Sequence, residues 1–402
     1  MGDILFLAHR VPFPPDRGDK IRAYHILKHL AGRKRVHLIA FADTPADMRA
    51  KNALARVTAS RAIFWRAKSR AVATIEAIAT GKPASITAFR NAMVEQAVDT
   101  LLTRHAIDTI YVFSSQMAQY LPPRGAQQRV VVDFVDVDSA KFADYAQGAG
   151  GAMRWLYGRE ASTLLRHDRA VAARADASLF VSEAEAALFR ERSGAERVFT
   201  VENGIDTAAF DPDARFKRID AIAQQIVFTG QMDYPPNVEA VRWFVDTILP
   251  HIRVRHPGAR FAIVGRNPTD AVRALAATPG VTVTGEVPDV RGWIAAASVV
   301  VAPLKLARGV QNKVLEAMAM ARPVVASAAA AEGIDHGGTI RVGGDIGGLA
   351  DAVSTLLADP VAANMLGAAA RRQVLARYGW DARLAALDAI IGLQPARAAV
   401  TA

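Results

Sequence analysis

The chain has 402 residues, of which 51% are hydrophobic and 22% are charged, a composition typical of a globular protein with room for two domains. It contains no cysteine, which excludes disulfides, thiol nucleophiles and cysteine-ligated zinc. No apolar run approaches the roughly 20 residues that cross a bilayer, and we expect no signal peptide in the short apolar run at the start.

Strand-like apolar runs alternate with helical patterns along the whole chain. In the first half, we expect strands at 4–8, 36–41, 107–113, 129–134 and 177–182, and helices at 20–31 and 153–175. In the second half, we expect strands at 225–229, 260–264, 281–285, 298–303, 323–327 and 340–342, and helices at 238–252, 290–296, 313–320, 349–358 and 360–378. This alternation predicts an α/β protein with two doubly wound parallel sheets.

The charge distribution indicates where the two domains meet. Residues 1–205 carry 29 basic and 21 acidic side chains, a net +8, whereas residues 206–402 carry 20 and 18, a net +2. A polar stretch at 206–224 follows this change. We therefore place a first domain at 1–205 and a second domain from 206 to 379.

One segment of the first domain is strongly basic. Between Arg49 and Arg70 there are seven basic residues and no acidic one, interleaved with apolar residues that include Trp65. Such a segment could lie on an anionic membrane surface; the alternative is an ordinary solvated basic face. We expect no nucleic-acid binding, because no recognised motif is present and few aromatic residues accompany the charges.

In an open parallel sheet, ligands bind beyond the carboxyl ends of the strands, so the loops at these ends are candidate ligand-binding loops. The loop at 9–22 contains Gly18, where the backbone could approach a ligand closely. Arg17, Asp19 and Lys20 surround that glycine. No G-x-G-x-x-G fingerprint is present. The alternative is a rigid surface loop.

Three carboxylates lie at the end of the expected strand at 129–134. Asp133, Asp136 and Asp138 could bind a metal or orient hydroxyl groups. The alternative for one of them is capping of the next helix by Asp138 or Ser139.

The second half repeats a strand followed by glycine and a polar loop. The stretches are FTGQMDYPPN with Gly230, VGRNP with Arg266, and TGEVPDV at 284–290. Each stretch alone is weak evidence for a ligand-binding loop, but three such stretches in succession within one domain are stronger evidence.

The stretch ARGVQNKVLEAMAMARPVVAS at 307–327 is the most informative of all. Asn312 and Lys313 fall at an expected helix N-terminus, where free N–H groups and the helix dipole favour an anion. Glu316, three residues after Lys313, lies on the same face and could accept hydrogen bonds from sugar hydroxyls. This pattern predicts a nucleotide-sugar site; the alternative is an ordinary exposed helix start.

Taken together, these motifs resemble the retaining glycosyltransferases of family 4, which have the GT-B architecture. VENGID (201–206), FTGQMDYPPN, VGRNP, TGEVPDV, the 307–327 stretch and the terminal YGWDARL carry the resemblance, which covers essentially the whole chain. The stretches RVPFPPDRGDKIRAYHILKHLA, VDFVDVDSAKF and FVSEAEAALF are similar to one subgroup, the sugar transferases associated with exosortase (PEP-CTERM) exopolysaccharide systems.

The resemblance implies two Rossmann-like domains that face a central cleft. The second domain would hold the nucleotide-sugar donor and the first would hold the acceptor. The last helix, near 380–393, would cross back, so that 380–402 joins the first domain.

The resemblance also assigns roles to individual donor-site residues. Glu316 matches the second Glu of the family's E-x7-E signature and would bind the ribose. Lys313 would meet the diphosphate, and Val287 would contact the base through its main chain. Gly18 matches a glycine loop near the phosphates.

The chain departs from the family pattern at two places. The first Glu of the signature is replaced by Arg308, which cannot accept hydrogen bonds but could bind a phosphate or an acidic sugar. The identity of the donor sugar is therefore open. Many members carry a histidine after the strand at 129–134, where this chain has Asp136 and Asp138, so the acceptor-side chemistry can differ.

The resemblance implies retaining transfer of a sugar from a nucleotide-diphosphate sugar. The subgroup resemblance and the basic segment Arg49–Arg70 suggest a lipid-linked or polysaccharide acceptor. Lys313, Arg308 and the helix N-terminus would neutralise the leaving phosphate, with help from Arg17 or Lys20. We expect no metal and no cofactor besides the co-substrate.

On the acceptor side, Asp136 or Asp138 would orient the hydroxyl. We expect the protein in the cytoplasm, with contact to the inner face of the membrane. Two alternatives stay open: a nucleotide-sugar 2-epimerase of the same architecture, and a catalytically degenerate nucleotide-binding protein.

Overall fold

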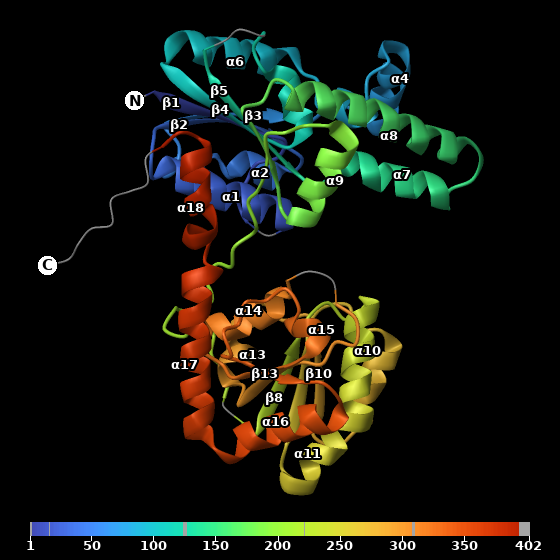
Figure 1. The fold of residues 1–402 in the computed structure, drawn as a ribbon, viewed down its shortest axis with the longest axis vertical. Coiled ribbons are helices and arrows are strands. Elements are labelled where there is room, and N and C mark those ends of the chain that lie inside the picture. Colours follow the sequence, from blue (N-terminus) through green and yellow to red (C-terminus); the bar gives the residue numbers. More distant parts are fainter. Residues whose placement is uncertain (1, 16, 124–126, 221, 308–309, 394–402) are drawn as a thin grey trace, which may run out of the picture. The chain divides into compact units, whose positions relative to one another are not determined.

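The computed structural model describes residues 2–15, 17–123, 127–220, 222–307 and 310–393. The chain divides into two compact units (Figure 1). Unit 1 comprises Met1–Asn203 and Arg383–Ala402, and unit 2 comprises Gly204–Ala382. Arg308, one of the predicted site residues, lies outside the described residues.

Unit 1 is built on a seven-stranded sheet in the order β3-β2-β1-β4-β5-β6-β7. Every pair of neighbouring strands is parallel. The strands are β1 (Asp3–Ala8), β2 (Val36–Ala42), β3 (Ser60–Trp65), β4 (Ile107–Phe113), β5 (Arg129–Val135), β6 (Ala177–Phe180) and β7 (Val198–Thr200). Because helices cover both faces of a parallel sheet, the central strands are continuous apolar runs, as in the fully buried Leu5–Ala8 of β1.

Helices connect these strands, and Figure 1 shows α1 and α6 on opposite faces of the sheet. The helices of unit 1 are α1 (Gly18–Ala31), α2 (Pro45–Arg49), α3 (Lys51–Leu54), α4 (Arg70–Thr80), α5 (Ala84–Thr87), α6 (Ala92–Arg104), the 3-10 helix η1 (Ser115–Tyr120), α7 (Asp138–Gly148), α8 (Gly151–Ala172) and α9 (Glu183–Ser193).

Unit 2 has a six-stranded parallel sheet in the order β10-β9-β8-β11-β12-β13. The strands are β8 (Gln225–Thr229), β9 (Arg260–Val264), β10 (Val281–Gly285), β11 (Val299–Ala302), β12 (Val324–Ser327) and β13 (Arg341–Gly343). The helices are α10 (Pro235–Trp243), the π-helix η2 (Phe244–Ile248), α11 (Leu249–Arg255), α12 (Asp270–Arg273), the 3-10 helix η3 (Ala274–Ala277), α13 (Arg291–Ala296), α14 (Asn312–Ala319), α15 (Ala328–Ala331), α16 (Ile346–Ala358) and α17 (Pro360–Arg377).

The last described helix, α18 (Trp380–Ile390), begins in unit 2 and ends in unit 1. Within unit 1, the buried Asp388 lies 2.8 Å from Nε2 of His29 on α1, and it also accepts from Arg33 Nε at 3.2 Å. The prediction that the terminal helix returns to the first domain is therefore confirmed, as are the two doubly wound parallel sheets.

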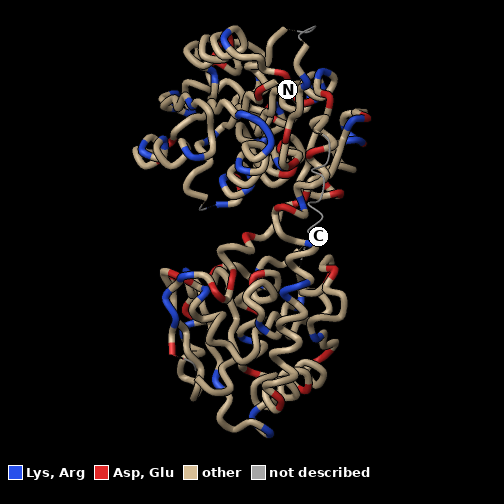
Figure 2. Tube along the Cα trace, turned by 90° about the vertical axis from the view of Figure 1, so that its left-hand side faces the viewer, with Lys and Arg blue, Asp and Glu red and all other residues tan. Residues whose placement is uncertain are grey.

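No single helix in the described parts of the chain is long and apolar enough to cross a membrane. The consecutive helices α16 and α17 reach the required length and composition only as a pair, and they are bent by 108° where they meet. Charged residues of both signs occur along both units (Figure 2).

Candidate active site

A hollow of about 670 Å³ lies at the carboxyl ends of β8, β9 and β10 in unit 2. The first turn of α14 forms another part of its wall. Its lining includes six of the predicted donor-site residues, namely Gly230, Arg266, Val287, Asn312, Lys313 and Glu316. The structure thus brings together residues from four separate stretches of unit 2.

Two glycines make the floor of this hollow narrow. A Cβ atom on Gly265 would lie 1.6 Å from the carbonyl oxygen of Gly230, so only glycine fits there. A Cβ on Gly230 would lie 2.8 Å from Nδ2 of Asn237 and 3.3 Å from Nζ of Lys313. The backbone at the ends of β8 and β9 can therefore approach a ligand and the lysine closely.

Lys313 is held in place over the floor of the hollow. Its Nζ donates a hydrogen bond to Oδ1 of Asn237 and lies 4.3 Å from the ring centroid of Phe228. Asn237 in turn donates to the carbonyl oxygen of Gln231 at 2.9 Å. Burial lowers the pKa of Lys313 to about 8, although the nearby Glu316 opposes this shift.

Glu316 has the opposite shift on the same helix face. Burial raises the pKa of its carboxyl group to about 7, against the effect of Lys313. Its carboxylate forms no hydrogen bond with the residues described. It is therefore a desolvated acceptor that a ligand hydroxyl could satisfy.

Backbone groups complete the set of donors and acceptors. Gln311 at the N-cap of α14 makes no capping hydrogen bond through its side chain, and Asn312 and Lys313, the first two residues of the helix, line the hollow. Neither the N–H nor the carbonyl of Val287 bonds to another described residue. Both are therefore available to the edge of a bound base.

The hollow contains further polar residues that the sequence interpretation did not single out. Glu286, Gln231 and Tyr234 also line it, and Tyr234 is 55% exposed. Their positions in the loops that follow strands β8 and β10 could have identified them from the sequence. The guanidinium of Arg266 donates to Oε1 of Gln231 at 3.1 Å.

The predicted acceptor-side residues lie in unit 1 and form separate groups. Arg17 donates to Asp19 at 2.6 and 3.0 Å, and Arg10 donates to the same carboxylate at 2.7 Å. Hydrogen bonds from these arginines and from His9 hold the pKa of Asp19 far below its usual range, despite the opposing effect of burial. Asp19 is thus a paired anion.

Lys20 and Gly18 both lie in the first turn of α1. Lys20 is buried and donates a hydrogen bond to Oδ1 of the buried Asp47 at 2.8 Å. Gly18 begins α1, and a Cβ atom there would meet nothing within 4 Å. No close approach within unit 1 requires a glycine at this position.

The three carboxylates at the end of β5 differ in their contacts. Asp133 is fully buried and accepts from Arg22 Nε at 2.9 Å and from the Tyr111 hydroxyl at 2.9 Å. Asp136 and Asp138 remain partly exposed, and both accept from Lys141, at 2.7 and 3.2 Å. The alternative role, capping of the next helix by Asp138 or Ser139, is wrong, because α7 has no side-chain cap.

Strain marks the carboxyl ends of β4 and β5. Ser114 directly follows β4 with φ of 79°, and Val135 at the end of β5 has φ of 71°. A β-branched residue is rarely found in this region, and such strain is often associated with functional sites. Val135 immediately precedes Asp136, which places that carboxylate on a constrained turn.

Sequence reasoning also missed polar groups behind this edge. His9 follows β1, is buried between Phe113 and Phe89, and its Nδ1 has no hydrogen-bond partner. The hydroxyl of Ser115 donates to the buried Asp168, and burial raises the pKa of Asp168 to about 7. His9 could have been noticed as a polar residue at a strand end, but Asp168 lies within a helix.

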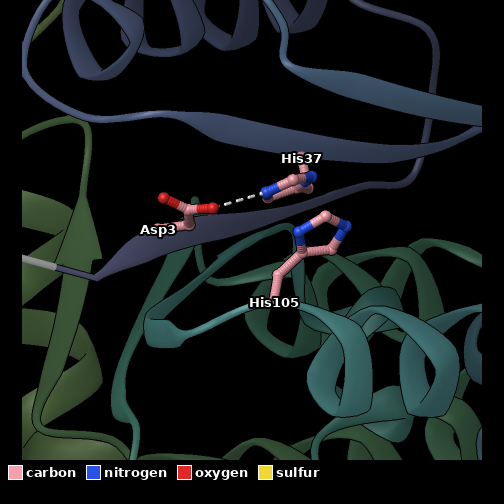
Figure 3. Close-up of side chains that lie close together, drawn as sticks. All are labelled: Asp3, His37 and His105. Atoms are coloured by element: carbon pink, nitrogen blue, oxygen red, sulfur yellow. Dashed lines mark hydrogen bonds and ion pairs between the residues drawn. The ribbon is translucent and has the colours of Figure 1, made fainter.

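One further group of titratable residues lies at the opposite end of the same sheet (Figure 3). Among the described residues, Asp3, His37 and His105 alone place three potential metal-ligand atoms within 4.8 Å of one another. However, His37 is already bonded to Asp3 at 2.9 Å and to Ser60 at 2.7 Å. The group sits at the amino ends of the strands, away from the predicted acceptor-side residues.

Comparison with known proteins agrees with this geometry. Residues 223–359 match the family model described as glycosyl transferases group 1. The match lies wholly within unit 2. The matched segment contains every described residue that lines the hollow of unit 2.

Relatives of the whole chain are more distant. A GDP-mannose-dependent alpha-(1-6)-phosphatidylinositol monomannoside mannosyltransferase from Mycobacterium tuberculosis is 28% identical over 325 residues, covering 73% of this chain and 78% of the relative. Sucrose-phosphate synthase from Thermosynechococcus elongatus has a similar fold, with a TM-score of 0.59 at 16% identity, over 96% of this chain and 98% of that one.

Anabaena Alr3699/HepE, solved in complex with UDP, also has a TM-score of 0.59, at 17% identity, over 96% of this chain and 98% of that one. At these identities the structures show the fold, which is GT-B. The findings together support a glycosyltransferase of the GT-B type.

Proposed function

We propose that this glycosyltransferase moves a sugar from a nucleotide-diphosphate sugar to an acceptor hydroxyl, with retention of configuration. The observation that carries the proposal is the donor hollow, where Lys313, Glu316 and the N-terminus of α14 share one wall. A cation and a helix N-terminus suit a diphosphate, and a desolvated carboxylate suits ribose hydroxyls. Val287 supplies main-chain groups for the base.

The leaving diphosphate needs charge neutralisation, and the chain's own groups supply it. Lys313 and the first N–H groups of α14 stabilise the phosphate as negative charge develops on it. We propose that Arg308 contacts the same phosphate or an acidic sugar. The donor site therefore needs no metal in this proposal, because cationic side chains take that role.

On the acceptor side, we propose that Asp136 or Asp138 orients the acceptor hydroxyl, and that transfer occurs on one face of the sugar. The leaving phosphate then takes the acceptor proton, so no protein nucleophile is required. Val135 holds the backbone before Asp136 in a rare conformation, which fixes its direction. Arg17 and Asp19 belong to the same edge of unit 1.

We further propose membership of retaining family 4 and of the exosortase-associated subgroup, with a lipid-linked or polysaccharide acceptor in exopolysaccharide synthesis. The mycobacterial relative is named as acting on a phosphatidylinositol mannoside, which is a lipid acceptor. The basic segment Arg49–Arg70 would then contact the anionic inner face of the cell membrane.

A thermal-shift panel tests the donor part of this proposal. The first ligands are GDP-mannose and UDP-glucose, followed by other UDP-, GDP-, ADP- and TDP-sugars. We expect one nucleotide to raise the melting temperature of the wild type and to lose that effect with Glu316→Ala. A shift that is equal in the variant would contradict the assigned role of Glu316.

A further inference from the structure

A second hollow, of about 440 Å³, lies in unit 1 at the carboxyl ends of β2 and β3. Three of its ten lining residues, Arg66, Lys68 and Arg90, are basic, and none is acidic. Phe41, Trp65 and Val72 supply apolar wall. The hollow therefore combines positive charge with a hydrophobic side.

The cations outnumber the carboxylates that pair with them. Lys68 and Arg90 share one partner, Glu76, at 2.6 and 3.3 Å. Arg66 shares Asp43 with Arg10. An anion in the hollow would relieve this excess of positive charge, and charge-assisted hydrogen bonds to arginine and lysine suit a phosphate.

The backbone adds to this preference. Ser69, the N-cap of α4, and Asn91, the N-cap of α6, both line the hollow. The positive ends of two helix dipoles, of 11 and 13 residues, are thus near the three cations.

An exposed apolar stripe leads away from the hollow along α4. Val72 lines the hollow and is 53% exposed, and Ile75 and Ile78 on the same helix are 68% and 50% exposed. The buried side of α4 is formed instead by Ala73 and Ala77. At about 1.5 Å per residue, the stripe extends about 9 Å beyond the hollow.

The stripe is unusual for a surface helix, because three large aliphatic side chains face solvent beside the partly exposed Trp65. A ligand that satisfies the whole surface must carry a negative head and a hydrocarbon tail. Neither a free phosphate nor an uncharged lipid would use both parts.

We infer that the hollow and the α4 stripe form a binding site for a lipid phosphate, with the phosphate among Arg66, Lys68 and Arg90 and the hydrocarbon along Val72, Ile75 and Ile78. The site specifies the acceptor class as a phosphate-bearing lipid, and that interpretation rests on the proposed transfer. In this proposal the surface that contacts the membrane includes α4 as well as the basic segment Arg49–Arg70.

Calorimetric titration of the full chain with farnesyl phosphate tests the inference, with inorganic phosphate and farnesol as comparison ligands. We expect farnesyl phosphate to bind at least about tenfold more tightly than either, because both parts of the site are used. Arg90→Met and Ile75→Glu should each weaken this binding about tenfold. Both side chains are exposed, so neither change should unfold the protein, and circular dichroism checks this.

Matched controls change similar side chains elsewhere. Arg104→Met removes an exposed arginine at the other end of α6, and Val254→Glu places a carboxylate on an exposed site of α11. Both should leave farnesyl phosphate binding unchanged. Equal affinity for phosphate and farnesyl phosphate, or no loss in the two site variants, would overturn the inference.

Flotation with phosphatidylglycerol vesicles identifies the source of the lipid. Binding to vesicles that both site variants lose would support a phospholipid of the bilayer, and binding only to farnesyl phosphate would support an isoprenoid carrier. Binding to neither would overturn the inference. Donor binding to unit 2 is measured separately, so failure here is distinguishable from failure of the transferase proposal.

Discussion

At the scale of single residues, the donor hollow is defined by two neighbouring ionisable groups with opposite pKa shifts. Burial lowers the pKa of Lys313 to about 8 and raises that of Glu316 to about 7. Both groups are thus poised to respond to a charged, hydroxyl-rich ligand. Glu316 has no hydrogen-bond partner among the described residues, so its desolvation costs free energy that a ligand can recover.

Replacing Glu316 by Gln should weaken nucleotide-sugar binding about tenfold, because an amide is a poorer acceptor for ribose hydroxyls than a carboxylate. Isothermal titration with the donor found in the thermal-shift panel measures this. Glu332→Gln, at an exposed position of unit 2, is the control and should bind normally. Unchanged affinity in the Glu316 variant would exclude the ribose role.

The same two groups predict the pH dependence of donor binding. The lowered pKa of Lys313 means that its positive charge is lost as the pH rises through about 8. The raised pKa of Glu316 means that its negative charge is lost as the pH falls through about 7. Affinity should therefore be highest between these values and fall on both sides.

Titrations at pH 6 to 9.5 measure this profile. A bound diphosphate favours the charged lysine, so binding above pH 8 should take up a proton, which titration in buffers of different ionisation enthalpy detects. Lys313→Met should bind more weakly and lose the alkaline fall. An alkaline fall that persists in this variant would assign it to another group.

At the scale of elements, much of the fold could be predicted because parallel strands are short apolar runs bounded by turns. The strands β4, β8, β9 and β10 have the bounds that their apolar runs indicated. The helix expected at 238–252 instead contains a π-helix, Phe244–Ile248. Pro250 has no N–H to donate to residue 246, which interrupts the α-helical pattern there.

The secondary structure of the basic segment could not be predicted from its local sequence pattern. The stretch Arg49–Arg70 contains the end of α2, all of α3 and the edge strand β3, with α4 starting at Arg70. β3 is only partly buried, so its apolar signal is weak. The pairing of Arg66 with Asp43, and of Lys68 with Glu76, joins residues 23 and 8 positions apart and is not visible as a motif.

The contrast between two glycines gives a sharp test at this scale. Gly265→Ala should disrupt the donor hollow, since the added Cβ would collide with the carbonyl of Gly230. We expect lower thermal stability and loss of donor binding. Gly18→Ala meets open space at the start of α1 and should keep the wild-type melting temperature. Similar behaviour of the two variants would contradict this assignment.

The buried pair Arg22–Asp133 connects α1 to β5 and should be important for stability. Arg22 also donates to the carbonyl of Val201 at 2.7 Å and to Asn203 at 3.0 Å. Arg22→Met leaves Asp133 as an unpaired buried charge and should cost about 3–5 kcal/mol. Denaturant unfolding measures this loss.

The double variant Arg22→Met with Asp133→Leu serves as the comparison. It removes both charges and should be less destabilised than Arg22→Met alone, because no buried charge is left without a partner. The single variant Asp133→Leu is measured as well. If its loss of unfolding free energy and that of Arg22→Met add up to the loss in the double variant, the two residues act independently, which would contradict the pairing.

At the scale of the whole molecule, the chain assigns different chemistry to its two units. Unit 2 gathers the described donor-site residues from four stretches of one domain. Unit 1 carries the proposed acceptor-side residues and the lipid-phosphate site. The residues that line the hollow of unit 2 could be predicted because each motif is local to a strand end, whereas Asp168, within α8, meets Ser115 only through packing.

The central claim is that the protein transfers a sugar from a nucleotide-diphosphate sugar to an acceptor. Release of nucleoside diphosphate measures this transfer most directly. The purified protein is incubated with the donor identified by thermal shift, with and without a butanol extract of bacterial membranes as acceptor. We predict diphosphate release that requires the extract, forms a labelled lipid product, and falls at least about tenfold in Lys313→Met. Conversion of the donor sugar without the extract, or donor binding with no release in its presence, would contradict the account.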